Sequence, residues 1–369
     1  MNAAPTALID LSALQQNLNR ARSAAPGSRM LAVIKANGYG HGLLRVAGAL
    51  SDAEALAVAR IGEGIRLREA GEKRPIAILE GFFDPQELQA AIHHRLEPVI
   101  HEPGQIEYLE QRPPSEPFHC WLKVDSGMHR LGFPVTEADA AFRRLSAIPA
   151  LQGRIRAMTH LANADDRSDA TTERQLEQFL SLVRPWGVES SISNSAGILG
   201  WKATHTEWVR PGIMLYGASP FLGRVGEEDG LLPVMTLRSR VIAVNKIRCG
   251  EGIGYGGDWK CPEDMTVGVI AIGYGDGYPR HATSGTPVLV NGKRVPLVGR
   301  VSMDMITVDL RSQPETRAGD PAILWGRGLP VEEIARAAGT IPYELFCGVT
   351  TRVEFIETSA VETTQQALA

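Results

Sequence analysis

The sequence predicts a (β/α)8 barrel followed by a mainly antiparallel β domain. Three observations support this prediction: the length of the chain, an alternation of apolar runs with helical segments over the first 217 residues, and closely spaced strands after about residue 230. At 369 residues the chain exceeds the ~250–300 residues that one hydrophobic core usually serves. We place the domains at residues 1–230 and 231–369, because "GRVGEEDGLLP" near their junction gathers glycine, charge and proline.

Eight short apolar runs supply the strands of the barrel. They lie at residues 30–35, 55–60, 76–81, 97–102, 120–125, 154–161, 190–195 and 208–217. Helical segments separate most of them, as in "TTERQLEQFLSLVRPW", where Leu176, Phe179, Leu180 and Val183 share one helix face. Strands that alternate with helices pair in parallel through right-handed crossovers, and eight such units close into a barrel. The interval 196–207 is short for a helical crossover.

The second domain is predicted from strand-like runs with little room for helices between them. The runs are "TLRSRVIAVNKI", "MTVGVIAIGYG", "TPVLVNGKRVPLVGRV" and "MITVDL". The pair Asn291-Gly292 is a strong signal for a two-residue hairpin turn. One short helix is expected around "PVEEIARAAG".

Composition argues against several classes of protein. A net charge of −4 and a pI near 6.2 disfavour a nucleic-acid or anionic-membrane partner, because either would favour a basic face. The N-terminus lacks the features of a signal peptide, and no stretch approaches ~18 uninterrupted apolar residues. The four cysteines lack the spacing of a metal or redox motif. We therefore expect a cytoplasmic protein with reduced thiols and no metal site.

Polar residues stand where the predicted barrel strands end. In a barrel of this kind the reactive groups lie at the carboxyl ends of the strands. Lys35 ends the first run in "AVIKANGYGHG", and Asp125, His160, Ser195 and Arg210 stand at or near the ends of others. The nearby glycines form no dinucleotide fingerprint. The segments "ISNSAG" and "RPGIMLYG" could instead hold a single phosphate through backbone amides and hydroxyls.

Taken together, the motifs of the chain resemble those of bacterial alanine racemases. They are "AVIKANGYGHG", "WLKVDSGMHRLG", "AMTHLANAD", "ISNSAG", "VRPGIMLYG", "GIGYGGDW", "IGYGDGYPR" and "GRVSMDMITVDL". The resemblance spans essentially the whole chain, and the family has the same barrel and β domain. It implies an isomerase that uses pyridoxal 5'-phosphate to interconvert L-alanine and D-alanine and supplies D-alanine for peptidoglycan.

The resemblance implies two catalytic residues and a supporting pair. Lys35 matches the lysine that forms the Schiff base with the cofactor, and Tyr255 matches the tyrosine on the opposite face of the substrate. Each takes or gives the Cα proton, according to the enantiomer. His160 links this tyrosine to Arg210, which faces the pyridine nitrogen of the cofactor. A guanidinium there disfavours protonation of the ring and favours return of the proton to Cα.

The resemblance also implies binding residues. The cofactor phosphate would be held by Tyr39, Ser195, Gly212 and Ile213. The substrate carboxylate would be met by Arg130 and the backbone of Met303, at an entrance shaped by Tyr274 and Asp304. Lys123 matches a lysine that is carbamylated in some members. Thr351 replaces a tyrosine common near the C-terminus, which puts cofactor affinity in question.

In the family the catalytic tyrosine comes from the partner subunit of a homodimer, so each active site is shared. Two other functions stay open. One is a racemase of broader specificity that accepts serine, and the other is a non-catalytic protein of pyridoxal-phosphate homeostasis. Such carrier proteins usually stop after the barrel. The β domain with Tyr255, Tyr274 and Met303 therefore favours the enzyme.

Overall fold

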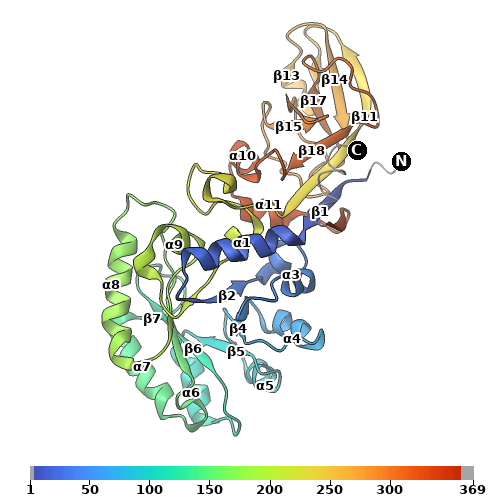
Figure 1. Cartoon of the computed structure of the whole chain (residues 1–369). Coiled ribbons are helices and arrows are strands. Elements are labelled where there is room, and N and C mark those ends of the chain that lie inside the picture. Colours follow the sequence, from blue (N-terminus) through green and yellow to red (C-terminus); the bar gives the residue numbers. More distant parts are fainter. Residues whose placement is uncertain (1–3, 359–369) are drawn as a thin grey trace.

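The computed structural model describes residues 4–358 and shows two domains. A barrel of strands surrounded by helices forms the lower part of Figure 1, and a twisted sheet forms the upper part. Within residues 4–358 no helix is both long enough and apolar enough to cross a membrane.

The barrel consists of eight parallel strands in a closed ring. Their order is β2, β3, β4, β5, β6, β8, β9, β10 and back to β2. The strands are β2 (Arg29–Val33), β3 (Ala55–Val58), β4 (Ile76–Ile78), β5 (Glu97–Ile100), β6 (Cys120–Asp125), β8 (Ile155–Met158), β9 (Ser190–Ser191) and β10 (Trp208–Val209). Each overlaps one predicted run, which confirms the predicted barrel. A short strand, β7 (Phe133–Pro134), pairs with β6 outside the ring.

Helices surround the barrel (Figure 1). They are α1 (Leu11–Ala24), α3 (Leu43–Ala49), α4 (Ile61–Glu69), α5 (Pro85–His93), α6 (Pro103–Gln111), α7 (Val135–Ala147), α8 (Thr171–Val183) and α9 (Ser195–Gly200). The face predicted for α8 is confirmed, because Phe179 and Val183 are buried and Leu176 and Leu180 pack against the core. The short interval before β10 holds α9 and one 3-10 turn, η3 (Lys202–Thr204).

The second domain is built on a mainly antiparallel eight-stranded sheet. Its order is β16, β15, β18, β11, β1, β19, and β14 and β17 extend it from β11. The strands are β1 (Thr6–Asp10), β11 (Met235–Ile247), β14 (Met265–Ile270), β15 (Pro287–Val290), β16 (Lys293–Pro296), β17 (Ile306–Asp309), β18 (Pro321–Trp325) and β19 (Glu354–Thr358). The turn between β15 and β16 is the predicted hairpin, with φ of 49° at Asn291 and 73° at Gly292.

Two helices and a small hairpin complete this domain. The predicted helix is α10 (Val331–Ala337), and a second helix, α11 (Pro342–Gly348), was not expected. The hairpin pairs β12 (Gly252–Ile253) with β13 (Trp259–Lys260) and forms a two-stranded sheet of its own.

The first strand of the chain lies in the second domain. β1 pairs antiparallel with β11 and parallel with β19. Directly after β1, the Asp10 carboxylate caps α1 by accepting the N–H groups of Ser12 and Ala13 at 3.0 and 3.1 Å. The expected first domain, residues 1–230, therefore includes one strand of the second sheet, and the chain passes between the domains twice.

Candidate active site

Lys35 opens an unusual turn at the mouth of the barrel. The chain leaves β2 into α2 (Lys35–Tyr39), where the four residues after Lys35 have φ between 50° and 64°. Left-handed backbone costs ~1–2 kcal/mol for each residue other than glycine, so the turn needs support from its surroundings. The Asn37 side chain accepts the N–H of Leu43 at 3.0 Å, and the Asn37 N–H donates to Glu63 at 3.3 Å.

The amine of Lys35 is poised toward its neutral form. Burial lowers its pKa, the charge of Arg130 lowers it further, and Glu80, Glu63 and Cys347 act in the opposite direction. Only a neutral amine can attack a carbonyl carbon, so this environment suits a lysine that forms a covalent bond with an aldehyde.

Tyr39 lies in an aromatic cluster and points its hydroxyl at a glycine. Its ring stacks on Tyr216, with centroids 4.6 Å apart, and lies 5.9 Å from the ring of Tyr343. A Cβ placed on Gly212 would lie 2.9 Å from the Tyr39 oxygen, so a side chain there would displace the hydroxyl. Burial raises the pKa of Tyr39. The hydroxyl therefore keeps its proton and can donate a hydrogen bond.

Ser195 joins two helix N-termini beside this hydroxyl. Its Oγ accepts the N–H groups of Gly212 at 2.9 Å and Met214 at 3.3 Å. Helix α9 begins at Ser195, and the 3-10 helix η4 (Ile213–Tyr216) begins one residue after Gly212. The first N–H groups of a helix lack partners within it and favour anions. Tyr39, Ser195, Gly212 and Ile213, the four residues predicted to hold a phosphate, therefore lie together.

Arg210 is almost enclosed, with 4% of its surface exposed. It donates to Ser191 Oγ at 2.6 Å, to Thr159 O at 2.5 Å and to Ile192 O at 3.1 Å, and it lies 3.4 Å from His160 Nδ1. Burial lowers its pKa to about 10, so the guanidinium remains charged at neutral pH. Strands β8 and β9 and the residues after them hold this charge in a fixed orientation.

Two titratable neighbours of Arg210 are shifted toward their neutral forms. Burial, and then the charge of Arg210, lowers the pKa of His160 well below its usual value. Burial, followed by Arg210 and Arg130, lowers the pKa of Lys123 to about 7, whereas Asp125 raises it. Near neutral pH a large share of Lys123 is therefore an uncharged amine.

Arg130, after β6 of the barrel, is exposed, and its charge acts on Lys35. The other predicted site residues lie on the second domain. Tyr255, Tyr274 and Met303 are 70%, 40% and 51% exposed. Tyr255 lies in η6 (Tyr255–Gly257), between β12 and β13. Figure 1 places β13 at the end of the second domain that is far from β2 and the barrel. Asp304 forms an ion pair with Arg352 at 2.6 Å. One chain thus presents two separate groups of predicted site residues, one on each domain.

Comparison with known proteins identifies the family. Residues 9–220 match the family model for the alanine racemase N-terminal domain, and residues 234–357 match the C-terminal domain. The chain belongs to the alanine racemase family. An alanine racemase of Nitrosococcus oceani is 55% identical over 95% of this chain and 98% of its own length. One of Halorhodospira halophila is 54% identical over 96% of this chain and 97% of its own length.

Solved structures of alanine racemases share the architecture. The biosynthetic alanine racemase of Pseudomonas aeruginosa superposes with a TM-score of 0.94 and 43% identity, covering 97% of this chain and 100% of that one. The alanine racemase of Acinetobacter baumannii gives a TM-score of 0.91 with 38% identity, and the same coverage. The resemblance read from the motifs and the predicted fold are both confirmed.

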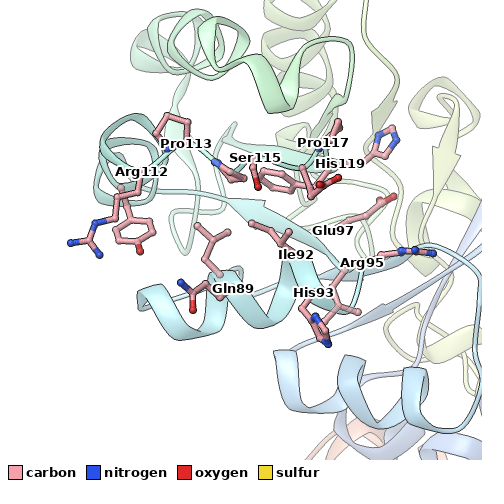
Figure 2. A pocket seen from close by; sticks show the side chains of 16 residues that line it. Gln89, Ile92, His93, Arg95, Glu97, Arg112, Pro113, Ser115, Pro117 and His119 are labelled. Atoms are coloured by element: carbon pink, nitrogen blue, oxygen red, sulfur yellow. The ribbon is translucent and has the colours of Figure 1, made fainter.

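A separate cavity of about 870 Å³ lies away from the predicted site of this alanine racemase family member. Figure 2 shows it between α5 and α6, with Ile92, Arg95 and His119 among its labelled side chains. The cavity adjoins the segments that lead into β5 and β6. It therefore lies at the amino ends of these strands, on the face of the barrel opposite their carboxyl ends. Because barrel enzymes react at the carboxyl ends of their strands, we do not assign the active site to this cavity.

Several residues around the site were not predicted. His41 and Tyr216 lie inside quoted motifs and pack against each other, with ring centroids 4.7 Å apart. His41 follows the left-handed turn, and the glycines around that turn are the sequence signal that could have found it. Tyr343 comes from α11 in the second domain, and nothing in its own sequence neighbourhood indicated a place beside Tyr39. Thr351, which replaces the tyrosine common in the family, is exposed.

Proposed function

We propose that this protein interconverts L-alanine and D-alanine with pyridoxal 5'-phosphate as its cofactor. The observation that carries the proposal is the joint position of Lys35, the donors around Ser195 and the enclosed charge of Arg210 at one mouth of the barrel. Lys35 supplies an amine for the aldehyde of the cofactor, the groups around Ser195 supply hydrogen-bond donors for its phosphate, and Arg210 supplies a cation for its ring nitrogen. The curated alanine racemases with more than half of their residues identical support the same reaction.

The donor set fits the cofactor. Lys35 would hold it covalently, and the hydroxyls of Tyr39 and Ser195 with the backbone of Gly212 and Ile213 would hold its phosphate. Pyridoxal phosphate, when bound, makes the Cα proton of an amino acid acidic. Arg210 keeps its own proton, so the ring nitrogen would stay unprotonated and the proton would return to Cα.

Two residues would move the Cα proton from opposite faces. Lys35 would accept or give it on one face, and Tyr255 would do so on the other. Neutral His160, 3.4 Å from Arg210, would link that guanidinium to this tyrosine. A phenol has a reference pKa near ~10, so Tyr255 needs such a neighbour to act as a base.

The second group of predicted residues would come from another copy of the chain. Tyr255, Tyr274 and Met303 are large and exposed, and aromatic and methionine side chains are enriched in protein interfaces. We infer a homodimer in which the Tyr255 of one protomer reaches the Lys35 of its partner. Residues 1–230 would then bind the cofactor, and residues 231–369 would supply Tyr255 to the active site of the partner subunit.

Arg130 and the backbone of Met303 would bind the substrate carboxylate, and Tyr274 with Asp304 would narrow the entrance. Lys123 would orient Arg130 as a carbamate. A neutral amine adds to carbon dioxide and releases one proton, and the pKa of Lys123, about 7, supplies that amine. The negative carbamate formed would be stabilised between Arg210 and Arg130, which both act on Lys123.

A racemisation assay in D₂O tests the proposal. We expect purified protein with pyridoxal phosphate to abolish the optical rotation of L-alanine and to place deuterium at Cα, with L-serine much slower. Similar rates for serine would favour the broader racemase. Cofactor binding without exchange at Cα would contradict the proposal and favour a carrier. The cellular role we propose is cytoplasmic supply of D-alanine for peptidoglycan.

A further inference from the structure

The hairpin that carries Tyr255 is weakly tied to the rest of the second domain. Its two strands, β12 and β13, pair only with each other. Ile253 of the hairpin and Cys261 beside it pack in a small satellite cluster, separate from the main core, with Met265 and Val267 of β14 and with Val298. A two-stranded hairpin with so small a core has little stability of its own and opens locally at low cost.

Two cysteines stand at the base of this hairpin, one on each side. Cys249 precedes β12 and Cys261 follows β13. The N–H of Gly250, the residue after Cys249, donates to the carbonyl of Cys261 at 2.8 Å, and the Cys261 N–H donates to Glu251 O at 2.9 Å. The Cys249 thiol lies 3.4 Å from the carbonyl of Pro262, the residue after Cys261. These contacts hold the two cysteine-bearing segments side by side, which is the arrangement that a disulfide needs, because it spans only ~4.4–6.8 Å between Cα atoms.

We propose that Cys249 and Cys261 are a thiol–disulfide site that links the two ends of the Tyr255 hairpin. Both thiols are free in this structure. The other two cysteines, Cys120 in β6 and Cys347 in α11, lie in other elements and have no such neighbour. Within residues 4–358 no group of three or more histidine, cysteine, aspartate or glutamate side chains could hold a metal ion, so the pair is assigned to thiol chemistry.

The reaction needs a small-molecule disulfide such as glutathione disulfide. The exposed Cys249 thiolate attacks one sulfur of this disulfide, forms a mixed disulfide and releases one glutathione thiol. The Cys261 thiolate then attacks the sulfur of Cys249, closes the protein disulfide and releases the second glutathione. Two protein thiols are oxidised, and one glutathione disulfide is reduced. An excess of dithiol reverses both steps.

The second step should be the slow one. Cys261 is 2% exposed, and burial, with the nearby Cys249, raises its pKa. Its thiolate therefore forms when the satellite cluster opens. Tyr255 lies at the centre of the chain between the two cysteines. Closing the disulfide therefore constrains the two ends of the hairpin that presents this tyrosine to the partner subunit. That consequence rests on the proposed role of Tyr255, whereas the cross-link itself does not.

Peptide mapping of the oxidised holoenzyme tests the proposal. After treatment with glutathione disulfide and alkylation of free thiols, we expect one peptide pair joined through Cys249 and Cys261 and a several-fold lower racemisation rate, both reversed by dithiothreitol. Cys249→Ser and Cys261→Ala should abolish the joined peptides and the oxidative loss. Cys347→Ser removes another exposed thiol. Oxidation of this variant should still join the two peptides and should still lower its racemisation rate compared with its own reduced form.

Two outcomes would overturn parts of the inference, and a third would bear on the proposed function alone. Glutathione retained on Cys249 beside an unmodified Cys261 would refute the cross-link. Joined peptides with an unchanged racemisation rate would refute the coupling to Tyr255. A reduced protein without racemase activity would contradict the proposed function, and the joined peptides would still decide the cross-link.

Discussion

The guanidinium of Arg210 lies 3.4 Å from Nδ1 of His160, beneath the mouth of the barrel, and three further acceptors fix its orientation. Ser191 Oγ and the carbonyls of Thr159 and Ile192 each accept one of its N–H groups. A charge with so little exposure is stable only if its hydrogen-bonding groups are paired. The position of this cation is thus set by the barrel before any ligand is present.

The first prediction concerns this network. Arg210→Lys keeps a positive charge but cannot reach all of these acceptors, and each buried acceptor left unpaired costs ~1–3 kcal/mol. We expect the free energy of unfolding to fall by ~2 kcal/mol and the racemisation rate by at least ~10-fold. Urea unfolding and a racemisation assay measure the two effects. Arg143→Lys, at a side chain 77% exposed, is the control and should stay within ~0.5 kcal/mol of the wild type.

The second prediction concerns stability against pH. His41 is fully buried, its Nδ1 lies 2.8 Å from the carbonyl of Tyr39, and burial lowers its pKa to about 4 from 6.5. Between pH 4 and 6.5 the His41 imidazole is protonated in the unfolded chain and neutral in the folded chain. Stability from this residue is therefore complete above pH 6.5 and falls by about 3 kcal/mol as the pH drops to 4. His160 shifts stability in the same direction.

Urea unfolding at several pH values between 7 and 4 tests this sign. In His41→Phe the ring contacts with Tyr216 and Phe346 can persist, while the titrating group is gone, so the loss of stability with falling pH should be shallower. Equal slopes in the wild type and in His41→Phe would show that His41 does not carry the effect.

The third prediction concerns the phosphate donors. Tyr39→Phe removes the hydroxyl that lies against Gly212 but keeps the stack on Tyr216. The loss of one hydrogen bond of ~1–1.5 kcal/mol should weaken cofactor binding about 10-fold and leave the fold intact. Fluorescence titration with pyridoxal phosphate gives the dissociation constant. Tyr108→Phe, at the separate cavity, should bind as the wild type does, and equal affinity in Tyr39→Phe would remove this hydroxyl from the phosphate site.

The sequence predicted the elements whose signals are local. The barrel strands are apolar runs between helical segments, and the β15–β16 hairpin has its Asn-Gly turn. The sheet to which β1 belongs was not predictable, because "TALID" fits either domain and its pairing with β11 and β19 joins residues more than 200 positions apart.

The candidate site shows the same difference between residues with a local sequence signal and residues placed by long-range packing. Strand ends located Lys35, His160 and Arg210, because barrel topology brings such ends to one mouth. The aromatic cluster around Tyr39 could not be found in this way. Tyr343 reaches it from a helix of the other domain, and such a contact depends on how the two domains pack.

The last prediction concerns the shared active site. If Tyr255 serves the partner's Lys35, then Lys35→Ala and Tyr255→Phe inactivate different halves of one site. Tyr255→Phe should keep the cofactor and lose exchange mainly from one enantiomer, whereas Lys35→Ala should lose the covalent attachment. A mixed dimer of the two variants contains one site with both native residues and one with neither.

Random mixing in equal amounts makes half of the dimers mixed, so about a quarter of all sites are intact. We therefore expect about a quarter of the wild-type rate after the two inactive variants are unfolded and refolded together, or produced in one cell. Each variant treated alone is the control and should stay inactive. If Lys35 and Tyr255 met within one chain, no mixed dimer would contain an intact site, and the mixture would be as inactive as its components.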